Sequence, residues 1–165
     1  MHIRPARDGD LAELTDLYNH YVVHSHATFD LEPFTVQARR AWFDQYAAAG
    51  PHRLLVGEVD GAVVGYASSG TFRAKPAYAA TVETSIYLHP GHVGRGLASP
   101  LYAALLDLLQ REETVHVAVA GVALPGAASV ALHLRHGFHP VGRFAELGYK
   151  FGRYIDVQWF HRPLA

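Results

Sequence analysis

The chain has 165 residues, half of them hydrophobic, which suits one domain spanning residues 1–165. Its 14 Lys and Arg against 15 Asp and Glu give a formal net charge of −1 at pH 7. Basic residues are scattered, which argues against a nucleic-acid or membrane-surface partner. The sequence shows no signal-peptide core and no apolar stretch near ~20 residues, so the cytoplasm is the expected location. The lack of cysteine excludes disulfides, thiolate metal sites and cysteine nucleophiles.

The N-terminal third of the sequence predicts a short strand followed by two helices. Residues 2–5 suit the strand, and Asp8 and Asp10 open a helix whose apolar residues follow the three- and four-residue spacing of one buried stripe. A second helix is expected to begin at the cap Thr35 and to end at residues 50–51. The buried faces are expected to carry Leu11, Leu14, Leu17, Tyr18 and Tyr21 in the first helix and Trp42 and Phe43 in the second.

The pattern then changes to strands. Residues 53–59 and 62–70 predict a hairpin, because Asp60-Gly61 supplies the positive φ angles that a tight turn requires, and residues 81–88 predict a further strand. The remaining expected elements are a loop over 89–95, a helix over 96–112, a strand over 115–121, a helix over 127–136, and two tail strands from residue 138 that break near 148–152. This order predicts an α+β fold in which helices cover both faces of a mixed sheet of about seven strands.

The loop before residue 96 has the composition of an anion site. Gly94 and Gly96 lack Cβ atoms, so the backbone can bring several N–H groups near one anion, and the following helix adds its unpaired first-turn donors. A diphosphate fits such a place. A nucleotide-hydrolase loop is excluded because Gly96-Leu97-Ala98 lacks the required lysine and hydroxyl, and a dinucleotide fingerprint is weak because only two of its three glycines are present. A helix entry that uses glycine only to turn stays open at this point.

The surrounding segments carry a resemblance that extends over nearly the whole chain. Residues 93–98 resemble the acetyl-CoA loop of the GNAT superfamily of N-acetyltransferases, whose pattern is Gln/Arg-x-x-Gly-x-Gly/Ala; Gly96 and Ala98 match, whereas Val93 departs. The resemblance implies an α/β/α GNAT fold with a mostly antiparallel sheet, and transfer of acetyl from acetyl-CoA to the amino group of a small amino-acid-like acceptor. The segments that are similar to phosphinothricin and methionine sulfoximine N-acetyltransferases are residues 18–21, 72–73, 77–78, 81–87, 121–125, 129–133 and 148–152, with Asp156.

The resemblance implies two catalytic residues. Glu83 matches the family's general base, which the reaction needs because an alkyl amine with a pKa near ~10 is almost entirely protonated at neutral pH. A carboxylate within an apolar strand is costly unless it faces a polar cavity, and an edge-strand glutamate pointing to solvent is the alternative. His133 stands where many superfamily members carry a tyrosine, and it is expected to protonate the departing CoA thiolate. A satisfied histidine on a buried helix face is the alternative for His133.

The resemblance also implies residues that bind the two substrates. The pantetheine arm is expected to pair with the end of the strand over 81–88, where this strand separates from the one at 115–121. Gly126 replaces a family-typical asparagine, which leaves the usual polar contact to this arm without its side chain. The residues expected to bind acetyl-CoA are Ile86, Tyr87, Leu88, Gly94, Arg95, Gly96, Leu97, Ala98 and Ser99. Those expected to bind the acceptor, with cations facing an acidic group and aromatic rings as walls, are Phe29, Arg73, Lys75, Tyr78, Tyr149 and Lys150. Solvated surface charge is the alternative for the two lysines.

Two rival functions stay open. A GNAT enzyme for a polyamine, an aminoglycoside or a protein amine would favour an acidic pocket, which Arg73, Lys75 and Lys150 speak against. A CoA-binding domain without chemistry is indicated by Val93 and Gly126 but opposed by Glu83 and His133. The 12 histidines form close pairs without the zinc-site pattern, so no metal is expected. A homodimer, formed through the tail strands, is expected from the resemblance.

Overall fold

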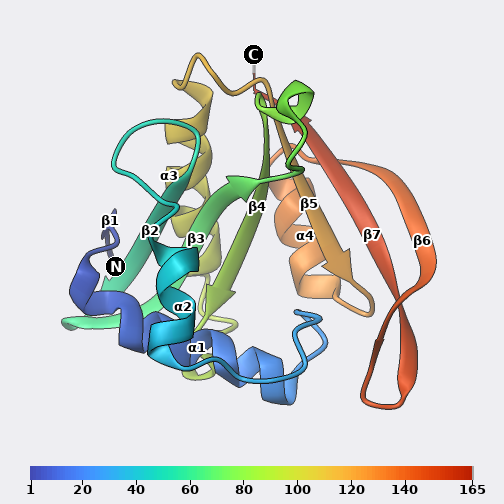
Figure 1. Cartoon of the computed structure of the whole chain (residues 1–165), viewed down its shortest axis with the longest axis horizontal. Coiled ribbons are helices and arrows are strands. Elements are labelled where there is room, and N and C mark those ends of the chain that lie inside the picture. Colours follow the sequence, from blue (N-terminus) through green and yellow to red (C-terminus); the bar gives the residue numbers. More distant parts are fainter. Residues whose placement is uncertain (165) are drawn as a thin grey trace.

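The structure is a computed structural model that describes residues 1–164, so Ala165, the last residue of the predicted domain, lies outside it. Its centre is a seven-stranded sheet in the order β1-β2-β3-β4-β5-β7-β6, antiparallel except for the β4–β5 pair (Figure 1). The strands are β1 (His2–Pro5), β2 (Arg53–Val59), β3 (Ala62–Thr71), β4 (Thr81–Leu88), β5 (Val117–Ala123), β6 (His139–Lys150) and β7 (Arg153–Pro163). The helices are α1 (Leu11–His24), α2 (Val36–Phe43), α3 (Ala98–Gln110) and α4 (Ala127–Arg135), with short 3-10 turns at Asp8–Asp10, Pro76–Tyr78 and Pro90–His92. Within residues 1–164, none of the helices is both long and apolar enough to cross a bilayer.

Helices cover both faces of the sheet, and this arrangement is the predicted α+β fold (Figure 1). The larger core cluster lies under α3, and a smaller one lies between α1 and the β2–β3 hairpin. Because successive side chains of a strand point to opposite faces, β4 sends Val82 and Leu88 into the larger core. Its alternate residues Glu83, Ser85 and Tyr87 face the α1 and α2 side, where they line a pocket.

Most element boundaries agree with the sequence-based expectation. The β2–β3 hairpin turns at Asp60 and Gly61, whose φ angles are 52° and 81°. The α3 helix begins at residue 98, two residues later than predicted, because Gly96 takes a left-handed φ of 75° and stays outside it. The β5 strand is shifted from the predicted 115–121 to 117–123.

The α2 helix differs most from the prediction. Thr35 does cap it, since its Oγ1 accepts a hydrogen bond from Ala38 N–H at 3.1 Å, but the helix ends at Phe43 and not at residues 50–51. The predicted buried residues Trp42 and Phe43 are only half-buried against the smaller core. The buried residue of α2 is a cation, Arg39.

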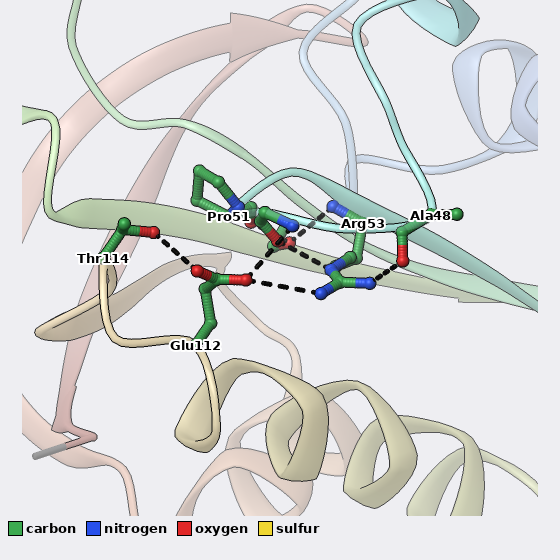
Figure 2. Close-up of polar contacts among 7 residues, drawn as sticks. Ala48, Pro51, Arg53, Glu112 and Thr114 are labelled. Atoms are coloured by element: carbon green, nitrogen blue, oxygen red, sulfur yellow. Dashed lines mark hydrogen bonds and ion pairs between the residues drawn. The ribbon is translucent and has the colours of Figure 1, made fainter.

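A polar cluster explains why residues 44–52 form a loop and do not extend α2. Arg53 donates its Nε–H to the carbonyl of Gly50 at 2.6 Å and an Nη1–H to that of Ala48, so these carbonyls need no helical partner (Figure 2). Glu112, just after α3, accepts from Gly50 N–H at 3.1 Å and from the Thr114 hydroxyl at 2.9 Å. These bonds hold the pKa of Glu112 below its usual value, and the bond from the Thr114 hydroxyl has the largest effect. The loop is therefore fastened to the end of α3.

The tail forms a long hairpin, β6–β7, at the edge of the sheet opposite β1 (Figure 1). It turns at Phe151 and Gly152, which have φ angles of 53° and 72°, inside the predicted break at 148–152. The pairing register also shifts between Phe144 and Gly148, where Glu146 has a φ of 54°. Most of β6 is exposed along its length.

Candidate functional site

A cleft opens where the two parallel strands separate. β4 and β5 pair only through residues 81–83 and 117–119, and beyond this point they diverge (Figure 1). Thr84 stands at the fork, where its Oγ1 lies 2.7 Å from the Tyr102 hydroxyl and donates to the Val119 carbonyl at 3.3 Å. The cleft has a volume of about 700 Å³ and lies between the ends of β4 and β5, the 93–99 loop and α4. Backbone groups of β4 that face β5 beyond residue 83 therefore border a cavity and not a neighbouring strand.

The loop that closes one end of this cleft presents free amide groups. Gly94 and Gly96 have φ angles of 79° and 75°, which favour glycine, and a Cβ atom on either would meet no atom within 4 Å. Among the described residues no side chain caps α3, whose N-cap is Leu97. The N–H groups of residues 94–97 have no backbone acceptor there either. Unpaired donors at a helix N-terminus attract an anion, so the loop has the geometry of a phosphate site.

Nearly all residues predicted to bind acetyl-CoA line this cleft. Ile86, Tyr87 and Leu88 border it from β4, and Gly94, Gly96, Leu97, Ala98 and Ser99 border it from the loop and α3. The Arg95 side chain is exposed and Arg95 is not part of the lining, so its backbone N–H is the group that it presents at this loop. The Ser99 hydroxyl lies 2.9 Å from His136 Nε2, and the Tyr21 hydroxyl, also in the lining, donates to the Leu88 carbonyl at 2.5 Å.

The backbone at Gly126 explains why this chain lacks the family-typical asparagine there. A Cβ atom on Gly126 would lie 2.7 Å from the Ala123 carbonyl oxygen and 3.0 Å from a Val122 methyl carbon. No side chain fits at that distance without a shift of the backbone. The neighbouring Pro125 carbonyl instead lies 2.7 Å from His26 Nε2, a contact that crosses the mouth of the cleft.

A second, smaller pocket lies on the opposite face of β4. Its volume is about 290 Å³, and it takes Glu83, Ser85 and Tyr87 from β4. Ser85 and Tyr87 line the large cleft as well, so the two cavities meet at this strand. The other lining residues that carry charge or a hydroxyl group include Tyr18, Asp30, Arg39, Tyr46, Tyr66 and Ser68.

The environment of Glu83 suits a proton acceptor. Its carboxyl group is half-buried, and this burial raises its pKa, while the charge of Arg73 opposes the rise. A raised pKa makes a carboxylate a stronger base. Tyr18, in the same pocket lining, donates to Asp30 and lies 2.6 Å from the Thr28 hydroxyl. Burial and the bond to Asp30 raise the pKa of Tyr18 to about 12, while the Thr28 contact opposes the rise.

His133 is 4% exposed and lies among aromatic rings of the core at the back of the large cleft. Its ring is stacked on Phe160 and lies edge-on to Tyr102 and Phe138. Nδ1 lies 2.7 Å from the Ser129 carbonyl, which fixes it as a donor, and Nε2 is buried without a partner among residues 1–164. Burial lowers the pKa of His133, so the ring is neutral at neutral pH.

The residues predicted to bind the acceptor are not gathered around the small pocket. Arg73 acts on Glu83 electrostatically, but Lys75 is exposed, and Tyr78, 42% exposed, packs edge-on against Phe72. None of the six predicted acceptor residues is part of the pocket lining.

The other three predicted residues lie at the β6–β7 hairpin. Tyr149 is exposed and contacts Tyr154, and the Phe29 ring packs so closely on Gly148 that a Cβ there would lie 2.3 Å from it. Lys150 is not a solvated surface charge: it is buried and donates to the Thr28 carbonyl at 2.8 Å. Burial lowers its pKa.

Sequence reasoning missed the residues that form most of the small pocket. Asp30, Arg39 and Tyr46 come from α2 and the loops on either side of it, far from β4 in sequence. The only local signal was a cation within the aromatic stretch that ends in Trp42 and Phe43, and an arginine on a short helix is ordinarily solvent-exposed.

Comparison with known proteins agrees with the phosphate-binding geometry of the large cleft. Residues 3–159 match the family described as Acetyltransferase (GNAT) domain. Over 166 residues the chain is 51% identical to a phosphinothricin N-acetyltransferase of Streptomyces coelicolor, covering 99% of this chain and 96% of the relative. It is 38% identical to an L-methionine sulfoximine/L-methionine sulfone acetyltransferase of Salmonella typhimurium, covering 99% of this chain and 95% of the relative.

Solved structures agree with the fold. A putative acetyltransferase from Salmonella typhimurium with its cofactor acetyl-CoA superposes with a TM-score of 0.95 at 38% identity, over 100% of this chain and 94% of that one. A phosphinothricin acetyltransferase from Sinorhizobium meliloti in complex with acetyl-CoA gives a TM-score of 0.94 at 30% identity, over 99% of this chain and 88% of that one.

Proposed function

Because this chain belongs to the acetyltransferase (GNAT) domain family and is an acetyl-CoA-dependent N-acetyltransferase, we propose that it acetylates a small amino-acid-like acceptor of the phosphinothricin or methionine sulfoximine/sulfone type. The observation that carries this proposal is the junction of two cavities at β4. A long cleft with free amides at one end meets a small polar pocket that holds Glu83. The relatives' acceptors are small amino acids, which suits a pocket of about 290 Å³.

The large cleft has the features that acetyl-CoA requires. The free amides of residues 94–97 and the uncapped start of α3 would hold its diphosphate, and Gly94 and Gly96 keep the approach open. The unpaired backbone of residues 84–88 would bind the amide groups of the pantetheine arm as an added strand would. Acetyl-CoA supplies the thioester that is attacked. Ser85 and Tyr87 border both cavities, so the acetyl end would lie where the acceptor enters.

Glu83 is the proposed general base. An acceptor amine with a pKa near ~10 must lose a proton before it can attack, and Glu83 lines the pocket where that amine would lie. Burial raises the pKa of this carboxyl group and so strengthens it as a base. Among the predicted acceptor contacts, Arg73 has the best support because its charge acts on Glu83. Lys75, Tyr78 and Tyr149 stay predictions, and the buried bond of Lys150 to Thr28 favours a role in holding the loop.

His133 is the proposed proton donor to the departing thiolate, and Nε2 is the proposed donating atom. Nδ1 is engaged with Ser129, whereas Nε2 has no partner in the described chain. The lowered pKa of His133 means that the ring carries no spare proton at rest. An anion within hydrogen-bond distance raises the pKa of an imidazole, so Nε2 would take up a proton from solvent as negative charge develops beside it and pass that proton to the departing thiolate.

The β6–β7 hairpin is the proposed dimer surface. Large apolar side chains on it are more than half exposed, and β6 is an edge strand with one unpaired side. These exposed apolar side chains are Val141, Phe144, Leu147, Tyr149, Phe151 and Tyr154. Light scattering should give twice the mass of an 18.1 kDa chain, and a monomer at micromolar concentration would contradict the proposal.

We also propose that residues 1–165 act as one domain, supported by the single sheet, and that the enzyme works in the cytoplasm, where acetyl-CoA is available.

The proposal is tested by measuring CoA release with a panel of amines. Phosphinothricin, L-methionine sulfoximine and L-methionine sulfone represent the proposed acceptors, and spermidine, an aminoglycoside and a lysine peptide represent the rivals. We expect kcat/KM for at least one amino-acid acceptor to exceed that of every rival amine by more than about tenfold, because only the former matches a small pocket that holds both charge signs. Preference for spermidine or the peptide would contradict the acceptor class. Tight acetyl-CoA binding without CoA release would favour a domain that has lost its chemistry.

A further inference from the structure

Arg39 is a buried cation without a counterion. It is 5% exposed, it lines the small pocket, and none of the ion pairs among residues 1–164 includes it. Two of its three side-chain nitrogens, Nε and Nη2, are buried without a hydrogen-bond partner in that part of the chain. Buried polar groups are normally paired, and buried charges nearly always are, so this guanidinium calls for an explanation.

Aromatic rings hold the faces of this guanidinium but not its edge. Its central carbon lies 3.7 Å from the centroid of the Trp42 ring and 4.2 Å from that of Tyr18. Such stacking offsets part of the cost of burying the charge and fixes the guanidinium in position. Rings cannot accept the in-plane N–H groups of an arginine, of which there are five. The donors along the edge are thus left for a group that enters the pocket.

The carboxylates of the pocket are engaged elsewhere. Asp30 accepts the hydroxyl of Tyr18, and no ion pair joins it to Arg39 within the described residues. Glu83 is influenced by the charge of Arg73, a different cation. The pocket therefore contains one proton acceptor on β4 and one unneutralised positive group on α2, and tyrosines also line it.

We propose that Arg39 binds the α-carboxylate of the acceptor and is therefore the residue that distinguishes α-amino acids from amines without a carboxylate. This inference rests on the proposed function, because it assumes that the amine approaches Glu83. In an α-amino acid the amine and the carboxylate are attached to the same carbon, and a pocket of about 290 Å³ brings both within reach of the two opposed groups. A guanidinium matches a carboxylate with two parallel hydrogen bonds, which fixes orientation as well as affinity.

The arrangement has a direct consequence for specificity. An acceptor without a carboxylate would leave Arg39 buried and unpaired in the complex, and sites built to bind a polar group reject analogues that lack it by large factors. We expect L-methionine sulfone to exceed its carboxamide in kcat/KM by on the order of 10²-fold or more. Phosphinothricin, which carries a second acidic group, should show the same dependence on its α-carboxylate.

The kinetic test compares two variants of neighbouring residues on α2. Arg39→Met removes the buried cation, and Arg40→Met removes an exposed one that pairs with Asp8 and Asp44. Arg39→Met should lower kcat/KM for L-methionine sulfone by about 10²-fold and leave the value for the carboxamide within about threefold, so that the preference collapses. Arg40→Met should change neither. Arg39→Lys, which keeps the charge but loses the planar fork, should fall between, and acetyl-CoA affinity in the other cavity reports whether each variant is folded.

A binding measurement separates this inference from the proposed function. The chain has two tryptophans, and Trp42 contacts the guanidinium of Arg39, so Trp159→Phe leaves one fluorescent reporter beside the proposed site. Fluorescence should respond to L-methionine sulfone and not to its carboxamide, and Arg39→Met should abolish the response. If the acid binds in this way but no CoA is released, the proposed function fails and the inference stands. Equal losses for acid and carboxamide in Arg39→Met, or no fluorescence response to the acid at millimolar concentration, would overturn the inference.

Discussion

The two cavities on either side of β4 differ in whether backbone groups or side chains supply their polar contacts. The large cleft is formed mainly by backbone: the free amides of residues 94–97, the unpaired edge of β4 and the close turn at Gly126. The small pocket is formed by side chains from α1, α2, β3, β4 and the loops on either side of α2, which include Asp30, Arg39 and Glu83. A backbone site depends on φ angles and open space, whereas a side-chain site depends on particular functional groups. Substitutions on the two sides should therefore have separable effects on acetyl-CoA binding and on the acceptor.

The largest expected effect tests the pocket side of this comparison. Glu83→Gln keeps the shape of the side chain but removes the base, so kcat should fall by about 10²- to 10⁴-fold while the acetyl-CoA Kd stays within about twofold. Because burial raises the pKa of Glu83, the fall of kcat/KM on the acid side should begin above the ordinary carboxyl range, at a pH where the group gains its proton. Titration calorimetry and a pH profile measure both quantities. A normal kcat in this variant would remove Glu83 from the mechanism.

His133 lines the large cleft but is proposed to act in the chemical step. It therefore tests whether a residue of the large cleft can affect kcat without affecting acetyl-CoA binding. His133→Phe should preserve packing against Tyr102, Phe138 and Phe160 and remove Nε2. We expect kcat to fall by about 10²-fold without a change in acetyl-CoA Kd, because only proton donation is lost. Stopped-flow measurement of thiolate release checks the step directly. Retention of wild-type kcat would leave His133 as a packing residue.

Gly96→Val tests the backbone side. Its positive φ and the open space around it mean that a branched side chain is strained and stands beside the free amides. We expect acetyl-CoA affinity to fall by about 10- to 100-fold, the loss of one or two hydrogen bonds to a charged group. Gly61→Val is the matched control, since Gly61 has a φ of 81° and equally open space in the β2–β3 turn, away from the cleft. Equal losses of acetyl-CoA affinity in both variants would assign the effect to backbone strain in general.

The smallest expected effect concerns the support of the pocket. Thr35→Ala removes the hydroxyl that caps α2, which costs about 1 kcal/mol of helix stability. Since α2 carries Arg39, the acceptor KM should rise about two- to fivefold, whereas the acetyl-CoA Kd should not change. Steady-state kinetics with both substrates varied would measure this. A change in acetyl-CoA Kd of the same size would break the separation between the two cavities.

The sequence by itself determined the fold and one of the two cavities. Apolar spacing and the Asp60-Gly61 turn predicted most of the elements, because these signals are local and agree with the tertiary packing. The loop over 93–98 predicted the anion site for the same reason: glycines in a contiguous segment fix the backbone wherever the segment lies. The motif does not encode the direction of the exposed Arg95 side chain, which lies outside the lining of the cleft.

Only the tertiary structure decided the acceptor pocket. Arg39 is buried against the rings of Tyr18 and Trp42, and Tyr18 comes from α1, outside the helix that carries Arg39. Lys150 likewise lies under the Thr28 loop because β6 and β7 return beside it. Burial of a charge is a property of what packs around it, and those neighbours come from distant segments. For that reason local sequence patterns could identify the backbone cleft but not the side chains that line the small pocket.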